Sequence, residues 1–244
     1  MVNNYTGKGI KVGIVDTGIL NMNHPAIKNN IIGGWNFSLD RKKKNDVSGN
    51  VWHGMAVASV ITSIAPDVEI VVAKVLDYFG EGTPRITAKG IRYCINQHCD
   101  IINCSVAGVK DRELEKAVKE AIEAGIIIVA SSGNSGDDKK YYPACYEGVI
   151  TVGAMDKEGK RANFSTHNEF VDILAVGVDV PVAFRDGWIT DSGTSYSAPY
   201  ITGTLAILKQ KLKEELKRNP TKEELYNEMI NNAKINNQGY RYIE

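Results

Sequence analysis

Short apolar runs alternate with helical patterns along most of the chain. Five runs rich in Val and Ile have the length of strands, and they cover residues 10–15, 68–76, 101–106, 126–130 and 149–152. Nearly continuous apolar runs are typical of strands buried on both faces of a parallel sheet. Because helical segments separate them, the order strand, helix, strand predicts an α/β fold with a mostly parallel sheet.

The helical segments differ in how clearly their limits are marked. One is expected over 87–98, and a clearer one over 112–124 carries an apolar stripe that ends at Gly125. Two more follow in the last third, over 204–217 and after Thr221, which forms a capping box with Glu224.

Two polar segments interrupt this pattern. Residues 181–191 predict a hairpin with Asp186 and Gly187 as its turn. Residues 40–50 are polar and rich in turn formers, so we expect a surface loop there.

Composition narrows the class of protein. The chain has 244 residues, 43% of them hydrophobic, which suits a single domain over 1–244. Lys and Arg number 29, as do Asp and Glu, so no basic surface for nucleic acid or an anionic membrane is indicated. No run is long enough to span a membrane, and the first residues do not form a signal peptide. The four cysteines lack metal spacing and predict reduced, buried thiols.

Four polar residues follow apolar runs or begin helical ones, where functional groups of α/β proteins gather. They are Asp16, His53, Asn134 and Ser195. Each also has a plain structural explanation. Asp16 and Asn134 can form turns, His53 can be a structural histidine, and Ser195, like Thr194, can cap a helix.

Together these segments resemble the subtilisin-like serine peptidases, or subtilases. The blocks VGIVDTGI, HGMAVASVI, SSGN and GTSYSAP surround the four residues in the order of that family. The resemblance implies a three-layer α/β/α fold. It also implies that Ser195 is the nucleophile, His53 the general base and Asp16 its orienting partner. Asn134 and the Ser195 N–H would hold the oxyanion.

The resemblance also implies how a peptide binds. Substrate would lie as an extended strand between Gly80, Glu81 and Gly82 on one side and Ser105, Val106 and Ala107 on the other. The pocket for the residue before the cut would be lined by 105–107 and by Ser131, Ser132 and Gly133, together with the 137–142 loop. In that loop Tyr141 would narrow the pocket, or Asp137 or Asp138 would favour a basic residue; a solvated loop is the alternative.

The sequence departs from the family at several points. HGMA at 53–56 replaces the usual His-Gly-Thr-His, YS stands at 196–197, and Tyr200 replaces a His. The N-terminus is short, and 64–66 joins a helix directly to the next strand, where the family completes a calcium site. We therefore expect no high-affinity calcium site and no required cofactor. A chain without signal, calcium or disulfides suits the cytoplasm, and it suggests a peptide-processing enzyme.

Two other functions remain open at this point. The departures at 55–56 and at Tyr200 fit a catalytically weak pseudoprotease that binds peptides. A nucleotide-binding protein is poorly supported, because Asp16–Ile19 contains no phosphate-binding glycine motif. The basic run 41–44 is expected to be a solvated face of its loop, or a patch that steers acidic peptides.

Overall fold

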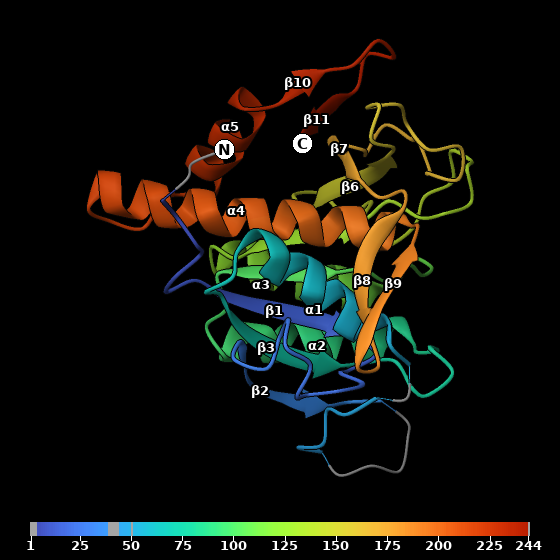
Figure 1. The fold of residues 1–244 in the computed structure, drawn as a ribbon, viewed down its shortest axis with the longest axis vertical. Coiled ribbons are helices and arrows are strands. Elements are labelled where there is room, and N and C mark those ends of the chain that lie inside the picture. Colours follow the sequence, from blue (N-terminus) through green and yellow to red (C-terminus); the bar gives the residue numbers. More distant parts are fainter. Residues whose placement is uncertain (1–3, 39–43, 50, 244) are drawn as a thin grey trace.

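The computed structural model describes residues 4–38, 44–49 and 51–243. Most of its strands form one sheet, whose order is β10-β11-β7-β6-β5-β4-β1-β3-β2 (Figure 1). The strands are β1 (Lys11–Asp16), β2 (Ile31–Asn36), β3 (Glu69–Lys74), β4 (Ile101–Cys104), β5 (Ile127–Ser131), β6 (Ile150–Met155), β7 (Ile173–Val176), β10 (Lys234–Ile235) and β11 (Arg241–Ile243). All neighbours pair in parallel except β10 and β11, which confirms the expected α/β sheet.

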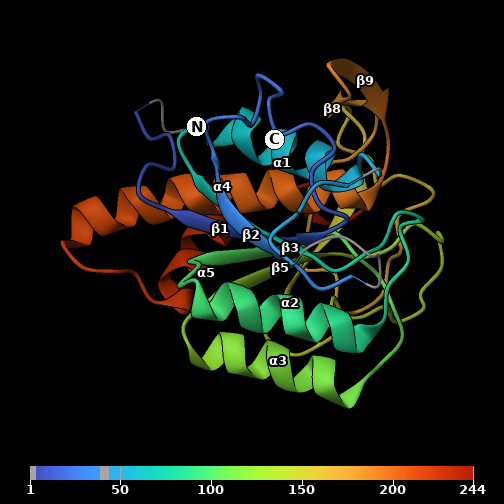
Figure 2. The ribbon, with the colours of Figure 1, turned by 90° about the horizontal axis from the view of Figure 1, so that it is seen from below.

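Helices cover both faces of this sheet. Figure 2 shows α1 (His53–Ile64) and α4 (Thr194–Leu216) on one face, and α2 (Pro84–Asn96) and α3 (Arg112–Glu123) on the other. A fifth helix, α5 (Lys222–Asn231), packs on α4. Side chains alternate along each strand between two cores. On β3, Ile70 and Val72 join the core beneath α1 and α4, whereas Val71 and Ala73 join the core beneath α2 and α3. The fold is therefore the predicted three-layer α/β/α arrangement.

The sheet order decides where polar loops meet. Strand β1 lies between β3 and β4, and β5 follows β4. The segments after β1, β3, β4 and β5 all leave the carboxyl edge of the sheet, because these strands are parallel. These segments carry most of the residues singled out in the sequence.

Helix α4 also holds the start of the chain. The Gln210 side-chain oxygen accepts hydrogen bonds from three successive backbone N–H groups. They belong to Thr6, Gly7 and Lys8, at 3.0, 2.9 and 3.2 Å. One helix therefore fastens a segment about 200 residues away in sequence.

Several predicted boundaries are wrong for local reasons. Helix α2 begins at Pro84, three residues before the prediction, because Thr83 caps it by accepting from the Ile86 N–H at 3.3 Å and proline suits the first helical position. Helix α4 begins at Thr194 rather than at 204. The prediction was wrong because Pro199 lies inside the helix, where proline usually marks a helix boundary. The predicted capping box of Thr221 and Glu224 is present.

The hairpin is present, but its turn is displaced by one residue. It consists of β8 (Val180–Phe184) and β9 (Gly187–Asp191), and Phe184 pairs with Gly187. The turn is therefore Arg185–Asp186, with Arg185 at a φ of 51°, and not Asp186–Gly187 as predicted. The hairpin packs against α1 through Val180 and Val182.

Three further observations concern expectations from the sequence. All four cysteines are free and buried, and burial raises the pKa of the Cys104 thiol. Part of the predicted surface loop, 40–43 and 50, lies outside the described residues, and with it most of the basic run 41–44. Among the described helices none has the length and apolarity to cross a membrane.

Candidate active site

Asp16 and His53 meet at the carboxyl edge of the sheet. Asp16 is the last residue of β1 and His53 the first of α1. The His53 Nδ1 atom lies 2.8 Å from Asp16 Oδ1, and the Asp16 side chain is fully buried. A carboxylate on Nδ1 holds the proton there, and therefore leaves Nε2 free to accept one.

Thr17 joins these two elements. Its hydroxyl accepts a hydrogen bond from the Gly54 N–H at 2.9 Å and donates to the Val51 carbonyl at 3.3 Å. Helix α1 lacks a side-chain cap of its own, so Thr17 satisfies one of its unpaired N–H groups from the end of β1. The backbone N–H of Thr17 also donates to Asp16 Oδ1 at 2.7 Å, which fixes the carboxylate.

Gly54 allows α1 to approach β1 closely. A Cβ atom at this position would lie 2.3 Å from the Gly18 carbonyl oxygen and 3.2 Å from Asp16 Oδ1. No larger residue fits there without moving the backbone. The sequence pattern of small residues after His53 therefore reflects this close approach.

The electrostatic surroundings of His53 favour its charged form. Burial by itself lowers the pKa of the imidazole, but the Asp16 carboxylate and its hydrogen bond outweigh this effect. A second carboxylate, Asp191, acts in the same direction. The pKa of His53 is therefore raised, and the ring readily holds a proton taken from a neighbouring group.

Ser195 lies in the first turn of α4, not before the helix as the sequence suggested, and the cap position is Gly193. Pro199 has no N–H, so it cannot bond the Ser195 carbonyl four residues back. The Ser105 hydroxyl donates to that carbonyl instead, at 2.9 Å. Asn103 Nδ2 in turn donates to the Ser105 hydroxyl at 2.9 Å. A buried chain of hydrogen bonds from β4 thus holds the Ser195 backbone.

His53 and the Ser195 segment face each other through Tyr196. The Tyr196 and His53 rings lie 6.1 Å apart between centroids. Within the described part of the chain, no hydrogen bond joins the Ser195 hydroxyl to His53. Catalytic hydrogen bonds of this type are often long without substrate and tighten in the complex.

The Asn134 side chain is fixed beside the same helix start. Its Oδ1 atom accepts hydrogen bonds from the Thr194 N–H at 2.9 Å and the Thr194 hydroxyl at 2.7 Å. The Gly133 N–H donates to the same hydroxyl at 3.3 Å. With its oxygen held twice, the amide presents Nδ2 close to Gly193, where a Cβ atom would lie 3.3 Å away. This arrangement offers a fixed N–H donor next to Ser195.

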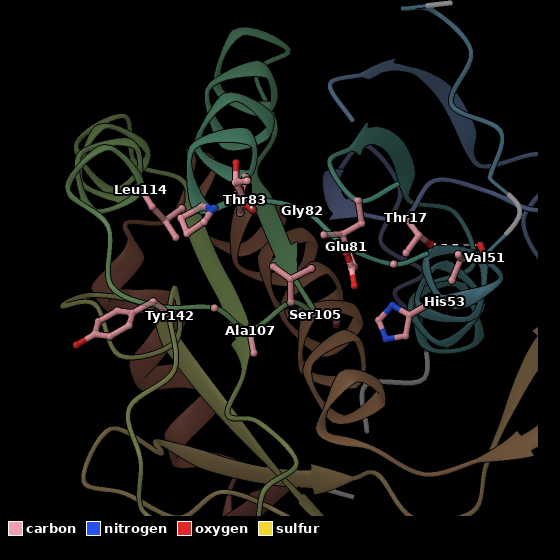
Figure 3. Close-up of a pocket in the computed structure, with 16 residues that line it drawn as sticks. Thr17, Val51, His53, Glu81, Gly82, Thr83, Ser105, Ala107, Leu114 and Tyr142 are labelled. Atoms are coloured by element: carbon pink, nitrogen blue, oxygen red, sulfur yellow. Dashed lines mark hydrogen bonds between the residues drawn. The ribbon is translucent and has the colours of Figure 1, made fainter. Parts of the chain in front are cut away.

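A cavity of about 560 Å³ extends from His53. In Figure 3 the segment of Glu81, Gly82 and Thr83 runs along one side of it and the segment of Ser105 and Ala107 along the other. His53 lies at one end, and Leu114 and Tyr142 lie at the opposite end. The six residues expected to flank a peptide therefore line one cavity: Gly80, Glu81, Gly82, Ser105, Val106 and Ala107.

Of the other residues expected to line the pocket, Tyr142 lies at the end of this cavity, whereas Ser131, Ser132 and Gly133 do not line it. Ser131 and Ser132 are buried, and Gly133 contacts Tyr141, whose ring carbon would lie 2.8 Å from a Cβ atom on that glycine. Asp137 is already paired, since it accepts from the Ser135 hydroxyl and binds Lys139 at 3.2 Å. The contact of Tyr141 is consistent with a narrowed pocket, which stays a prediction.

Comparison with known proteins identifies the family. The model of the subtilase family matches residues 7–242. The chain belongs to the subtilase family.

Individual relatives agree with this assignment. The intracellular serine protease of Paenibacillus polymyxa is 35% identical over 265 aligned residues, which cover 99% of this chain and 81% of the relative. The major intracellular serine protease of Bacillus subtilis (strain 168) is 35% identical over 244 residues, covering 92% and 76%. The crystal structure of a cold adapted subtilisin-like serine proteinase has a TM-score of 0.87 at 28% identity, covering 98% and 89%. The chain is therefore a subtilisin-like serine protease, and it binds peptide or protein substrates.

Several contributors to the site were missed from the sequence. Thr17 follows Asp16 directly, and a hydroxyl residue beside a candidate carboxylate is a signal that could have found it. Thr194 was considered only as a cap. Leu114 reaches the cavity from a distant helix, for which no local pattern exists, whereas Tyr142 belongs to the 137–142 loop that was expected there.

Proposed function

We propose that this subtilase hydrolyses peptide bonds through the triad Asp16, His53 and Ser195. The observation that carries the proposal is the buried 2.8 Å contact between Asp16 and His53, beside the helix start that carries Ser195. The fixed amide of Asn134 supports it, because an oxyanion needs a donor that is already oriented.

The steps follow from these positions. His53 Nε2 takes the hydroxyl proton as Ser195 Oγ attacks the scissile carbonyl carbon. Asn134 Nδ2 and the Ser195 N–H stabilise the negative oxygen. The proton then passes to the leaving amine, and the acyl-enzyme ester remains on Ser195. Water hydrolyses the ester by the same proton transfers, which releases the acid and restores the serine.

We propose that the substrate adds a strand between the two segments of the cavity. The backbone of Glu81 is already hydrogen-bonded within its own loop. Its N–H donates to Asp77 Oδ1 at 3.0 Å, and its carbonyl accepts from the Asp77 N–H at 2.8 Å. Within the described chain no hydrogen bond engages the backbone of Gly82, Val106 or Ala107. Those groups remain available to a peptide in the β-augmentation mode.

The proposed setting is the cytoplasm, where the enzyme would process peptides. Support comes from the names of the two relatives above, both intracellular serine proteases. We also propose that no metal is needed, because only residues 65–68 join α1 to β3, where the family completes a calcium site. Fractionation of the source cells tests the first proposal, and a melting temperature unchanged by EDTA tests the second.

Intact mass after incubation with a fluorophosphonate probe tests the triad. The wild-type chain should gain one adduct, and Ser195→Ala and His53→Ala should gain none. Ser197→Ala is the matched control, because Ser197 is a buried serine two residues along the same helix. Its adduct should persist. Absence of an adduct on the wild-type chain would instead favour a pseudoprotease that binds peptides.

A further inference from the structure

Tyr196 connects the hairpin to the catalytic histidine. Its hydroxyl donates to Asp191 Oδ2 at 2.7 Å, and its side chain is only 2% exposed. On its other side, its ring lies 6.1 Å from the His53 ring, tilted by 41°. The same ring packs with Ala56 of α1 and Val182 of β8. Tyr196 belongs to the helix that carries Ser195, and it packs against both the helix of His53 and the hairpin.

Asp191 is held just as firmly. It is the last residue of β9, four positions before Ser195. Its Oδ1 atom accepts from the Ser192 N–H at 2.8 Å, while Oδ2 accepts from Tyr196. Burial and the neighbouring carboxylate raise the pKa of Tyr196, so the phenol keeps its proton and remains a donor. Both carboxylate oxygens are thus engaged in fixed positions.

From this geometry we infer that Tyr196 and Asp191 are a positioning pair that holds the His53 ring and places a second carboxylate near it. The inference rests on the proposed function, in which His53 is the general base. Neither residue touches the reacting atoms. The pair acts through His53 and through the short connection from β9 to Ser195.

The charges around His53 fit this role. Asp16 contacts the ring from β1, and the neutral phenol of Tyr196 lies beside it on α4. Asp191 acts on the ring electrostatically from β9, and Glu81 lines the same cavity. After Asp16, Asp191 is the charged group that further raises the pKa of His53. Removing its charge should therefore lower the pKa of His53.

The decisive test is an NMR titration of the His53 ring in the full chain carrying Ser195→Ala, which needs no catalysis. The His53→Ala spectrum assigns the signal among the four histidines. Asp191→Asn should lower the pKa of His53. Asp186→Asn is the matched control. It removes a carboxylate from the turn of the same hairpin, where Asp186 accepts from Asn21 at 2.9 Å, and it should leave the titration unchanged. The inference is overturned if Asp191→Asn leaves the pKa of His53 unchanged, or if both variants shift that pKa equally.

Tyr196→Phe provides a second, kinetic test because it keeps the ring and removes the hydroxyl. Loss of one hydrogen bond to a charged group should lower kcat about threefold to tenfold with KM within about twofold. A raised KM at unchanged kcat would mean that the pair contacts substrate instead, which contradicts a positioning role. If the proposed function itself were wrong, the rates of peptide hydrolysis by Ser195→Ala and by the wild-type chain would be equal. The shift of the His53 pKa in Asp191→Asn would still be seen, so the two failures can be told apart.

Discussion

The contact between α1 and β1 is the most direct point at which to perturb the site. In the substitution Gly54→Ala, the new Cβ atom would lie 2.3 Å from the Gly18 carbonyl oxygen. The backbone fixes the positions of both the Cβ atom and the Gly18 carbonyl oxygen, so no side-chain rotation relieves the overlap. The start of α1 must move away from β1 by about 1 Å, a displacement that can cost about 10²-fold in rate when it misplaces a catalytic group.

The expected loss follows from the His53 contact. The distance from His53 Nδ1 to Asp16 Oδ1 is 2.8 Å, so a displacement of that size takes the pair beyond hydrogen-bond range. We expect kcat to fall about 100-fold and the free energy of unfolding to fall by about 1–3 kcal/mol, as for other overpacked sites. Since the Asp16 contact raises the pKa of His53, that pKa should also fall.

Peptidase kinetics, urea unfolding and an NMR titration of His53 measure the three effects. Gly33→Ala is the matched control, because a Cβ atom at Gly33 on β2 meets nothing within 4 Å. It should change none of them beyond the small propensity effect expected for a strand. If folded Gly54→Ala protein kept its kcat within about threefold and its His53 pKa unchanged, the close approach would not be what positions the base.

Three further predictions concern other parts of the chain. Asn134→Ala should lower kcat about 10²–10³-fold with little change in KM, the loss measured for the corresponding donor of a subtilisin; a change confined to KM would remove Asn134 from the oxyanion site. Ser197→Ala should raise the free energy of unfolding by about 1 kcal/mol in urea titrations, because its buried hydroxyl has no hydrogen-bond partner among the described residues; a destabilised variant would reveal one. The hydrogen bond from Arg218 lowers the pKa of Glu224 from 4.5 to about 2, so its stabilising contribution is full above 4.5 and is lost as pH falls toward 2. Glu224→Gln should therefore flatten the pH dependence of unfolding in that range, and unchanged slopes would show that the pair is not formed in solution.

The sequence predicted best where a pattern is local. Continuous Val and Ile runs located β1, β3, β4, β5 and β6, because a strand that is buried on both faces consists almost entirely of apolar residues. The edge strand β2 was missed, since Gly33 and Gly34 break its apolar run. Strands β10 and β11 are too short and exposed to leave a pattern.

The same distinction applies to the candidate site. The blocks around Asp16 and His53 located two residues that the structure brings into contact. The hydrogen bond between Tyr196 and Asp191 was not predicted, because it brings the hairpin close to His53 only through the packing of the hairpin against α1. Likewise, the start of α4 depended on how the Ser195 carbonyl is satisfied, and that partner, Ser105, lies 90 residues away.

The long reach of α4 has a consequence for the order in which the protease is made. Asp16 and His53 leave the ribosome before Ser195, which lies 142 residues after His53. Gln210, which fastens residues 6–8, is made later still. Helix α4 thus brings Ser195 to the candidate site and secures residues 6–8, and contacts so distant in sequence form slowly. A growing chain consequently lacks Ser195 while Asp16 and His53 are already made, so the site proposed above is completed only after both segments that flank its cavity have been made.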